Sequence, residues 1–268
     1  MNQTLAKETM LEKIAATVRL RVAQDKTLRS LGELKAATKN YQRKKLDFYH
    51  RFDQFGYNII AEIKLASPSR GMIAQLDPVM VAGEYLKNGA AALSILTEPV
   101  FFKGDIAYLS AIRQAYPQAL LLQKDFVVDP YQLFQAKLAG ADAILIIVAL
   151  LGEDGSQQIL DQARQLGLAA LVEVHNAEEL AIAERIGAEL IGINNRNLKD
   201  LTISLAVSLQ LLPLVSQRAK IICESGIEQP KDLALLQAAG CHGFLVGTSL
   251  MKTGEPGEAL ARLLGHAH

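Results

Sequence analysis

Residues 141–194 carry the clearest fold signal in the chain and read ADAILIIVALLGEDGSQQILDQARQLGLAALVEVHNAEELAIAERIGAELIGIN. Within this stretch, short apolar runs alternate with segments of helical periodicity. The apolar runs are Ala141–Val148, Ala169–Val174 and Leu190–Asn194, and the helical segments are 156–165 and 176–186. Because strands that run straight through apolar residues are typical of a parallel sheet buried on both faces, the stretch predicts consecutive strand–helix units.

The same alternation extends from Gly56 to the last predicted helix. The other predicted strands are Tyr57–Lys64, Ala91–Thr97, Ala119–Lys124, Ala219–Glu224 and Gly243–Gly247. The other predicted helices are 78–88, 105–115, 129–138, 204–214, 228–239 and 255–264. Eight such units of about 25 residues each predict an α/β fold, the (β/α)8 TIM barrel. A doubly wound open sheet is the alternative, and the lack of a Gly-x-Gly-x-x-Gly motif after the first strand disfavours it.

The segment before the first strand, residues 1–50, is predicted to be a helical N-terminal extension of a single barrel domain that spans 1–268. Apolar residues recur there at three- and four-residue spacing, at Leu11, Ile14, Ala15 and Val18. This spacing predicts a helix with one apolar face. Thr9 and Glu12 have the spacing of a capping box, which favours a helix that begins just after Thr9, and Thr4 is an earlier candidate cap.

A bare barrel needs no residues before its first strand, so the extension calls for an explanation. We expect it to pack near the open mouth of the barrel, with Phe48, Tyr49 and Phe52 helping to cover a bound substrate. Closure of this kind excludes water and holds a flexible ligand in a reactive pose. The alternative is a helix that only caps the bottom of the barrel.

Composition and charge exclude several classes of protein. The chain has 28 Lys and Arg against 28 Asp and Glu, so no broad basic field predicts a nucleic-acid partner. The N-terminus lacks the apolar segment of a signal peptide, and no apolar run approaches the roughly 20 residues of a membrane span. Cys223 and Cys241 lie in or beside apolar runs and are expected to be core residues in a reducing compartment. We therefore expect a cytoplasmic protein with no membrane partner.

Charged residues concentrate where the predicted strands end. In barrels of this class, chemistry lies at the carboxyl ends of the strands. Glu62 and Lys64 are two apart at the end of the first strand, so they share one face. Lys124 and Glu173 end the third and fifth strands. Buried charge is unfavourable unless it is paired or used, which favours a reactive site; a purely structural ion-pair network is the alternative.

The loops after the last two strands predict a phosphate site. Ser225-Gly226 and Gly247-Thr248-Ser249 follow the seventh and eighth strands. Small residues allow backbone N–H groups to approach an anion, and these loops often bind phosphate in barrels. Ordinary turns use the same residue types, so each pair alone is weak support.

Ordered motifs along the chain now resemble one family, the indole-3-glycerol-phosphate synthases. The first-strand motif, IAEIKLASPSRG at 60–71, is the most specific. The others are LTEP at 96–99 with Phe102 and Gly104, KDF at 124–126, Glu173, GINNRNL at 192–198, ESGI at 224–227 and VGTSL at 246–250. The resemblance implies ring closure, decarboxylation and dehydration of 1-(2-carboxyphenylamino)-1-deoxyribulose 5-phosphate, as in tryptophan biosynthesis, without a cofactor.

The resemblance and this chemistry imply roles for the residues at the mouth. Ring closure puts charge on the ketone oxygen, so an acid must protonate it, and Lys124 is the expected acid. The other expected catalytic residues are Glu62 and Glu173 for proton transfer, Lys64 as a second acid or an anion partner, and Asn194 and Ser225 near the anthranilate end. The expected substrate-binding residues are Ser67, Phe102, Phe126, Arg196, Glu224, Gly226, Gly247 and Thr248. How Lys64 and Lys124 divide their roles stays open.

Two other functions remain to be weighed. Another phosphate-binding barrel, such as phosphoribosylanthranilate isomerase, needs one acid and one base and does not explain two lysines with two glutamates. A catalytically silent scaffold would have lost some of these charges, and none is missing. We expect no metal, because no His, Cys and carboxylate cluster has ligand spacing. His175 is expected beside the site or exposed, and the protein is expected to be a monomer or a weak homo-oligomer.

Overall fold

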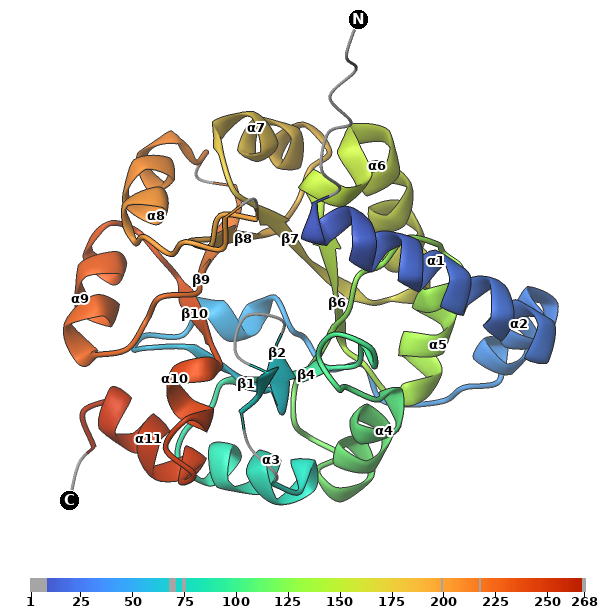
Figure 1. Ribbon diagram of the computed structural model, residues 1–268, viewed down its shortest axis with the longest axis horizontal. Coiled ribbons are helices and arrows are strands. Elements are labelled where there is room, and N and C mark those ends of the chain that lie inside the picture. Colours follow the sequence, from blue (N-terminus) through green and yellow to red (C-terminus); the bar gives the residue numbers. More distant parts are fainter. Residues whose placement is uncertain (1–8, 68–70, 74–75, 199, 217, 267–268) are drawn as a thin grey trace, which may run out of the picture.

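Eight parallel strands close into a barrel in the computed structural model, which describes residues 9–67, 71–73, 76–198, 200–216 and 218–266 (Figure 1). They are β1 (Ile59–Ile63), β4 (Ala92–Leu96), β5 (Leu121–Lys124), β6 (Ala143–Ile147), β7 (Ala169–Val174), β8 (Leu190–Asn194), β9 (Lys220–Glu224) and β10 (Gly243–Val246). The strands follow one another around the barrel in chain order, and β10 pairs with β1 to close it. The predicted (β/α)8 barrel is confirmed.

Helices surround the barrel and lie close to the predicted ranges. They are α3 (Pro78–Lys87), α4 (Ile106–Ala115), α5 (Tyr131–Ala139), α6 (Val148–Leu166), α7 (Ala177–Arg185), α8 (Ala206–Leu211) with the 3-10 turn η2 (Leu212–Leu214), α9 (Pro230–Ala238) and α11 (Pro256–Leu263). Gly140 ends α5 with φ 96°, in the left-handed region where a residue without Cβ is favoured. Helix α5 therefore ends there, and β6 begins three residues later.

The boundary between β6 and α6 differs from the prediction. The apolar run was predicted as strand through Val148, but α6 already begins there. Gly152 interrupts this helix with φ 65° and ψ −170°, so the long element is two helical pieces joined across a kink. A short apolar run fits a buried strand and a buried helix turn equally well, which explains the difference.

Four short elements in the described part of the chain were not predicted. Strands β2 (Ala66–Ser67) and β3 (Gly71–Met72) form a small antiparallel hairpin in the loop after β1. Helix α10 (Thr248–Met251) follows β10 directly, and the 3-10 turn η1 (His50–Asp53) precedes β1. Elements of two to four residues have too few positions to show a period, so sequence patterns do not reveal them.

The amino end of the barrel is filled by aromatic side chains of the N-terminal extension. Phe48 and Phe52 are 1% and 2% exposed and pack with interior strand residues such as Ile60. The Tyr49 hydroxyl accepts a hydrogen bond from the Ala170 N–H at the start of β7, at 2.9 Å. The expectation that Phe48, Tyr49 and Phe52 help to cover the substrate is therefore wrong. Phe48 and Phe52 instead fill the amino end of the barrel, because the interior there is apolar and would otherwise be empty.

The first helix of the N-terminal extension lies near the other end of the barrel, where the strands end. Helix α1 (Met10–Leu28) begins near the carboxyl end of the barrel, and α1 and α2 (Leu31–Lys39) pack on α5 (Figure 1). Thr9 and Glu12 form the predicted capping box, and the other candidate cap, Thr4, lies outside the described residues. Ile14 and Val18 of α1 are buried against Tyr131 and Phe134 of α5. The predicted apolar helix face is confirmed, and its partner is the outer surface of the barrel.

Two further predictions concern the core and the membrane. Cys223 and Cys241 are both buried and carry free thiols, as expected for core residues. Across the described ranges, no helix has the length and apolar character needed to cross a bilayer.

Candidate active site

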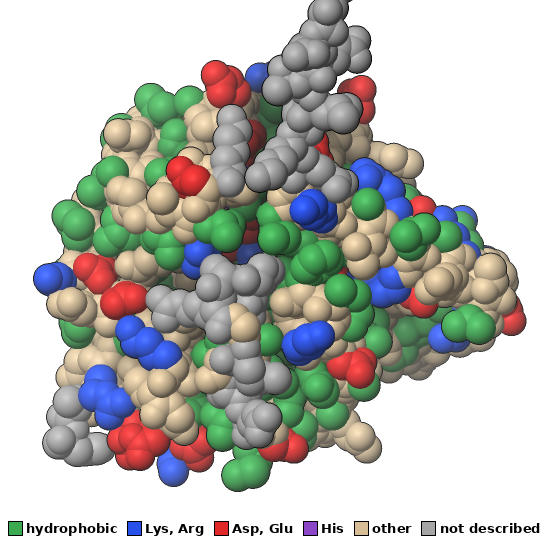
Figure 2. Space-filling model, viewed as in Figure 1, with side chains coloured by type: hydrophobic (Ala, Val, Ile, Leu, Met, Phe, Trp, Pro, Cys, Tyr) green, Lys and Arg blue, Asp and Glu red, His purple; other side chains and the backbone are tan. Residues whose placement is uncertain are grey.

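A cleft opens at the carboxyl end of the barrel, lined by residues from the ends of its strands. Figure 2 shows this face, with charged side chains visible in a central hollow and hydrophobic side chains around it. Most of the predicted site residues line the cleft: Glu62, Lys64, Phe102, Lys124, Phe126, Glu173, Asn194, Arg196, Glu224, Ser225, Gly226, Gly247 and Thr248. The side chain of Ser67, the remaining predicted residue, lies outside the part of the structure that is described.

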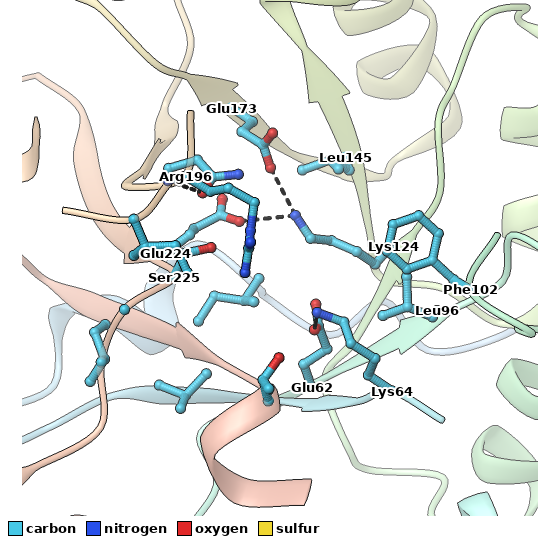
Figure 3. Close-up of a pocket in the computed structure, with 18 of the residues that line it drawn as sticks. Glu62, Lys64, Leu96, Phe102, Lys124, Leu145, Glu173, Arg196, Glu224 and Ser225 are labelled. Carbon is cyan, nitrogen blue, oxygen red and sulfur yellow. Dashed lines mark hydrogen bonds and ion pairs between the residues drawn. The ribbon is translucent and has the colours of Figure 1, made fainter. Parts of the chain in front are cut away.

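Lys124 occupies the centre of the charged cluster. Its Nζ lies 2.8 Å from Glu173 Oε2 and 2.9 Å from Glu224 Oε2, so one ammonium holds two carboxylates (Figure 3). The strands β5, β7 and β9 supply these groups, and all three side chains are almost fully buried. We predicted Glu224 as a substrate-binding group, and the structure places its carboxylate on Lys124.

Burial and charge set different protonation states in this cluster. Burial disfavours the ammonium of Lys124, but Glu173 and Glu224 outweigh it and raise the pKa of Lys124 above its usual range. Burial also disfavours the carboxylate of Glu173, but Lys124 and His175 lower its pKa well below the usual range. Burial raises the pKa of Glu224, and repulsion from Glu173 raises it further. Together these effects exceed the lowering by Lys124, so the pKa of Glu224 is raised to about 7. The cluster thus holds an ammonium, a carboxylate and a carboxyl group that titrates near neutrality.

Glu62 and Lys64 form a second charged pair at the end of β1. The Lys64 ammonium contacts Glu62 Oε1, and both side chains face the cleft as the strand alternation predicted (Figure 3). Gly247 makes this arrangement possible, because a Cβ at that position would lie 2.4 Å from Glu62 Oε1. A side chain larger than hydrogen at Gly247 would push the Glu62 carboxylate aside.

Ser225 is held in an unusual backbone conformation at the edge of the cleft. Its φ is 66°, in the left-handed region that non-glycine residues rarely adopt. The Asn195 amide donates to the carbonyl oxygens of Glu224 and Ser225 at 3.0 and 3.1 Å, and its Oδ1 accepts from the Ser208 N–H. Strain of this kind persists only where the surroundings enforce it, and Asn195 enforces it here.

The predicted phosphate loops lie side by side in the lining of the cleft. Gly226 follows Ser225 with φ 81°, and Gly247 precedes the short helix α10. A pair of loops after the last two strands, with the N-terminus of a short extra helix, is the usual phosphate site of barrels. The backbone is therefore placed as that site requires.

An apolar extension of the cleft lies between α1 and the barrel. Met10, Leu11 and Ile14 of α1 line it together with Phe102, Phe126 and Leu198. The two phenyl rings lie 5.8 Å apart between centroids and are tilted by 35°. Lys64 and Arg196 border the same space, so a flat ring bound here would lie beside cationic groups.

Several supporting residues were not assigned a role from the sequence. Arg21 of α1 binds both oxygens of Asp125 at 3.0 Å, and the Thr97 hydroxyl donates to Asp125 at 2.7 Å. The Gln123 amide in turn donates to Thr97. This chain of contacts fixes the residue next to Lys124 to the N-terminal helix. A buried carboxylate beside a lysine in the KDF motif was the available signal, but its partner lies 104 positions away.

Glu98 also supports the site without having been assigned a role from the sequence. It is 1% exposed, and its carboxylate accepts hydrogen bonds from the backbone N–H groups of Val100, Phe101 and Phe102. The loop after β4 is thereby tightened so that Phe102 reaches the cleft. No group of three His, Cys, Asp or Glu side chains suited to hold a metal is found within the described residues.

Comparison with known proteins identifies the family of the chain. The model of the indole-3-glycerol phosphate synthase family matches residues 11–263. An indole-3-glycerol phosphate synthase of Lachnoclostridium phytofermentans is 43% identical, over 91% of this chain and 94% of the relative. Relatives of the same description from Chromobacterium violaceum and Nocardioides are 47% and 42% identical, over 76% and 96% of this chain and 77% and 98% of theirs.

Solved structures show the same fold at low sequence identity. The 3-hexulose-6-phosphate synthase of Salmonella typhimurium has a TM-score of 0.61 at 13% identity, over 79% of this chain and 100% of that one. The thiamine phosphate pyrophosphorylase of Pyrococcus furiosus has a TM-score of 0.59 at 16% identity, over 81% of this chain and 96% of that one. Those two matches concern the barrel alone, whereas the family match and the close relatives show that the chain belongs to the indole-3-glycerol phosphate synthase family.

Proposed function

We propose that the cleft at the carboxyl end of the barrel is where this protein carries out its family's reaction. The protein is an enzyme, a carboxy-lyase that makes indole-3-glycerol phosphate. Its phosphorylated substrate, 1-(2-carboxyphenylamino)-1-deoxyribulose 5-phosphate, loses one carbon dioxide and one water in the process. The residue roles below are our assignment.

Ring closure is assigned to Lys124. The ring carbon that bears the carboxylate attacks the ketone carbon, a carbon–carbon bond forms, and the carbonyl π electrons move to oxygen. The Lys124 ammonium donates a proton to that oxygen, which becomes a hydroxyl group. Glu224 lies 2.9 Å from Lys124 and titrates near neutrality, so it is placed to return a proton to the amine.

Decarboxylation and dehydration complete the indole. The carbon–carboxylate bond breaks, carbon dioxide leaves, and its electron pair neutralises the iminium nitrogen formed on closure. The new hydroxyl then leaves as water while a proton departs from the neighbouring carbon. Glu173 is ionised and is assigned as the base, and the Lys64–Glu62 pair is assigned as the acid that protonates the leaving hydroxyl.

The remaining lining residues bind the ends of the substrate. The loops at Gly226 and at Gly247-Thr248 are assigned to the phosphate. Phe102 and Phe126 are assigned to the anthranilate ring, with Arg196 matched to its carboxylate by the planar guanidinium. Asn194 and Ser225 also line the cleft and are assigned to orient the amine and the ring.

The single observation that carries the proposal is the ammonium of Lys124 between two buried carboxyl groups, 2.8 and 2.9 Å away, at the carboxyl end of the barrel. A structural ion-pair network gains nothing from a carboxyl group that titrates near neutrality, whereas acid–base chemistry uses one. Neither cysteine lines the cleft among the described residues, so the isomerase alternative could not draw its acid from a cysteine there.

A turnover assay tests the function directly. The protein contains no Trp, so indole fluorescence of the product will rise from a low background when substrate is added. We expect one carbon dioxide released for each indole formed. Absence of both products from folded protein would support the scaffold alternative. Light scattering of the same sample tests the prediction of a monomer or a weak homo-oligomer.

A further inference from the structure

The two carboxylates on Lys124 differ in what surrounds their second oxygen. Glu173 Oε1 lies 3.3 Å from Nε2 of His175, in the loop between β7 and α7. Glu224 Oε1 is buried and has no hydrogen-bond partner within the described residues. It lies against Gly192, where a Cβ would approach to 2.1 Å. Among the ion pairs found for the described residues, Glu173 therefore contacts both Lys124 and His175, whereas Glu224 contacts Lys124.

The orientation of the His175 ring is fixed from its other side. Nδ1 lies 3.0 Å from Glu179 Oε2, which also accepts the backbone N–H of His175 at 2.8 Å. The second oxygen of Glu179 accepts from the amide of Asn176 at 2.7 Å. Since both carboxylate oxygens of Glu179 are held, the ring of His175 cannot turn away from Glu173 without breaking these contacts.

The charged groups around His175 determine whether its imidazole ring is protonated. Glu179 of α7 and Glu173 of β7 face the imidazole, while Lys124 of β5, Glu224 of β9 and Glu62 of β1 complete the charged surroundings. Burial disfavours an imidazolium, but the nearby carboxylates of Glu173, in ion-pair contact at 3.3 Å, and of Glu179, hydrogen-bonded at 3.0 Å, outweigh it and raise the pKa of His175 to about 10. The ring carries a positive charge at neutral pH.

We propose that His175, as an imidazolium clamped between Glu179 and Glu173, is the positioning residue that keeps Glu173 ionised and thereby directs the shared proton to Glu224. This assignment rests on the proposed function. Without His175 as a second cation, the two similar carboxylates of Glu173 and Glu224 would compete for Lys124 and for one proton. With His175 in place, Glu173 is the base and Glu224 holds the proton before substrate binds, because a nearby opposite charge favours the ionised carboxylate.

A titration without substrate tests the proposal independently of turnover. Protein labelled with carbon-13 at the glutamate carboxyl groups is titrated by NMR, with Glu173→Gln and Glu224→Gln used to assign the two signals. In the intact protein, Glu173 is expected to stay ionised through the acidic range while Glu224 titrates near pH 7. His175→Gln should raise the midpoint of Glu173 by roughly one to three pH units and lower that of Glu224.

Two further variants make the result interpretable. His50→Gln removes a histidine–carboxylate pair of similar length, 2.8 Å to Asp53, at the far end of the barrel, and should leave both midpoints unchanged. Glu179→Gln should shift Glu173 in the same direction as His175→Gln by a smaller amount, and serves as well if His175→Gln does not fold.

The pH profile of turnover gives the second readout. Because Glu173 must be ionised, His175→Gln should move the acid limb of kcat/KM upward by a similar amount, which narrows the active pH range from the acid side. Unchanged midpoints in folded His175→Gln and Glu179→Gln proteins would overturn the proposal, even if turnover fell. If the midpoints of Glu173 and Glu224 shift in these variants but the intact protein makes no indole, the role of His175 is supported and the proposed function is refuted.

Discussion

At the amino end of the barrel, the apolar side chains of Phe48 and Phe52 fill the interior. At the carboxyl end, the same interior carries the charged side chains of Lys124, Glu173 and Glu224. Both regions are buried, and both are contacted by the N-terminal extension. Burial of carbon stabilises the fold, while burial of charge is unfavourable unless each group finds a partner. The comparison separates the part of the barrel that holds it together from the part that reacts.

Phe52→Ala should produce the largest change in stability. The side chain is buried against Ile60 and the other interior residues at the strand starts, so its loss leaves a cavity. We expect the free energy of unfolding to fall by about 3–5 kcal/mol, with turnover of the folded fraction unchanged. Denaturant unfolding and a turnover assay on one sample measure both. Phe55→Ala, in a fully exposed position nearby, is the control and should change neither.

Lys124→Ala should produce the largest change in turnover. Removing the assigned acid is expected to lower kcat by about 100-fold or more while the far-ultraviolet circular dichroism is retained. Lys220→Ala, which removes a lysine paired with Asp53 at the amino end of the barrel, is the matched control and should leave kcat unchanged. A Lys124→Ala protein that turns over nearly as fast as the intact one would remove this residue from the chemistry.

Arg21→Ala tests whether α1 acts on the site through its contact with Asp125. Asp125 is buried, and its loss of both Arg21 hydrogen bonds should displace the neighbouring Lys124 and Phe126. We expect kcat/KM to fall roughly tenfold, with Arg21→Lys restoring part of it.

Lys26→Ala is the control for this effect, because it breaks another ion pair of α1, with Asp129, that is more exposed. It should alter stability slightly and kcat/KM not at all. Equal losses of kcat/KM in the two variants would mean that α1 only stabilises the barrel.

Exhaustive chelation is expected to have the smallest effect, namely none. The mouth supplies two lysines as electrophiles, so the assigned steps need neither a metal nor an organic cofactor. Activity should persist after dialysis against a chelator. A loss of activity that one divalent ion restores would show that an essential part of the site is missing from this account.

Sequence reasoning located the mouth better than the bottom of the barrel. Glu62, Lys64, Lys124 and Glu173 were placed correctly because strand alternation and strand ends follow fixed geometric rules. Phe48 and Phe52 were misplaced, since an aromatic residue in a linking segment shows no period and fits a lid or a plug. Only the path of the chain from α1 past α2 to η1 decides between them.

The contacts that support the site were harder still to predict. Asn195 holds the strained turn at Ser225, and Arg21 reaches Asp125 across 104 positions of sequence. His175 was expected beside the site or exposed, and the structure places it against Glu173. The pairings of Asn195 and Arg21 arise from tertiary packing, and a single sequence contains no pattern that specifies partners 30 and 104 positions away. Glu173 and His175 are only two positions apart, the spacing that places side chains on one face of a strand, but the sequence does not show that their side chains meet.

The central claim is that the substrate's ketone meets Lys124 at the carboxyl end of the barrel. The most direct measurement is a crystal structure with a substrate analogue whose ketone has been reduced to an alcohol and which therefore cannot close its ring. We predict the hydroxyl group within about 2.7–3.2 Å of Lys124 Nζ, the phosphate at Gly226 and Gly247, and the aromatic ring beside Phe102 and Phe126. A bound analogue with its phosphate on Lys124, or its hydroxyl group far from that ammonium, would contradict the claim.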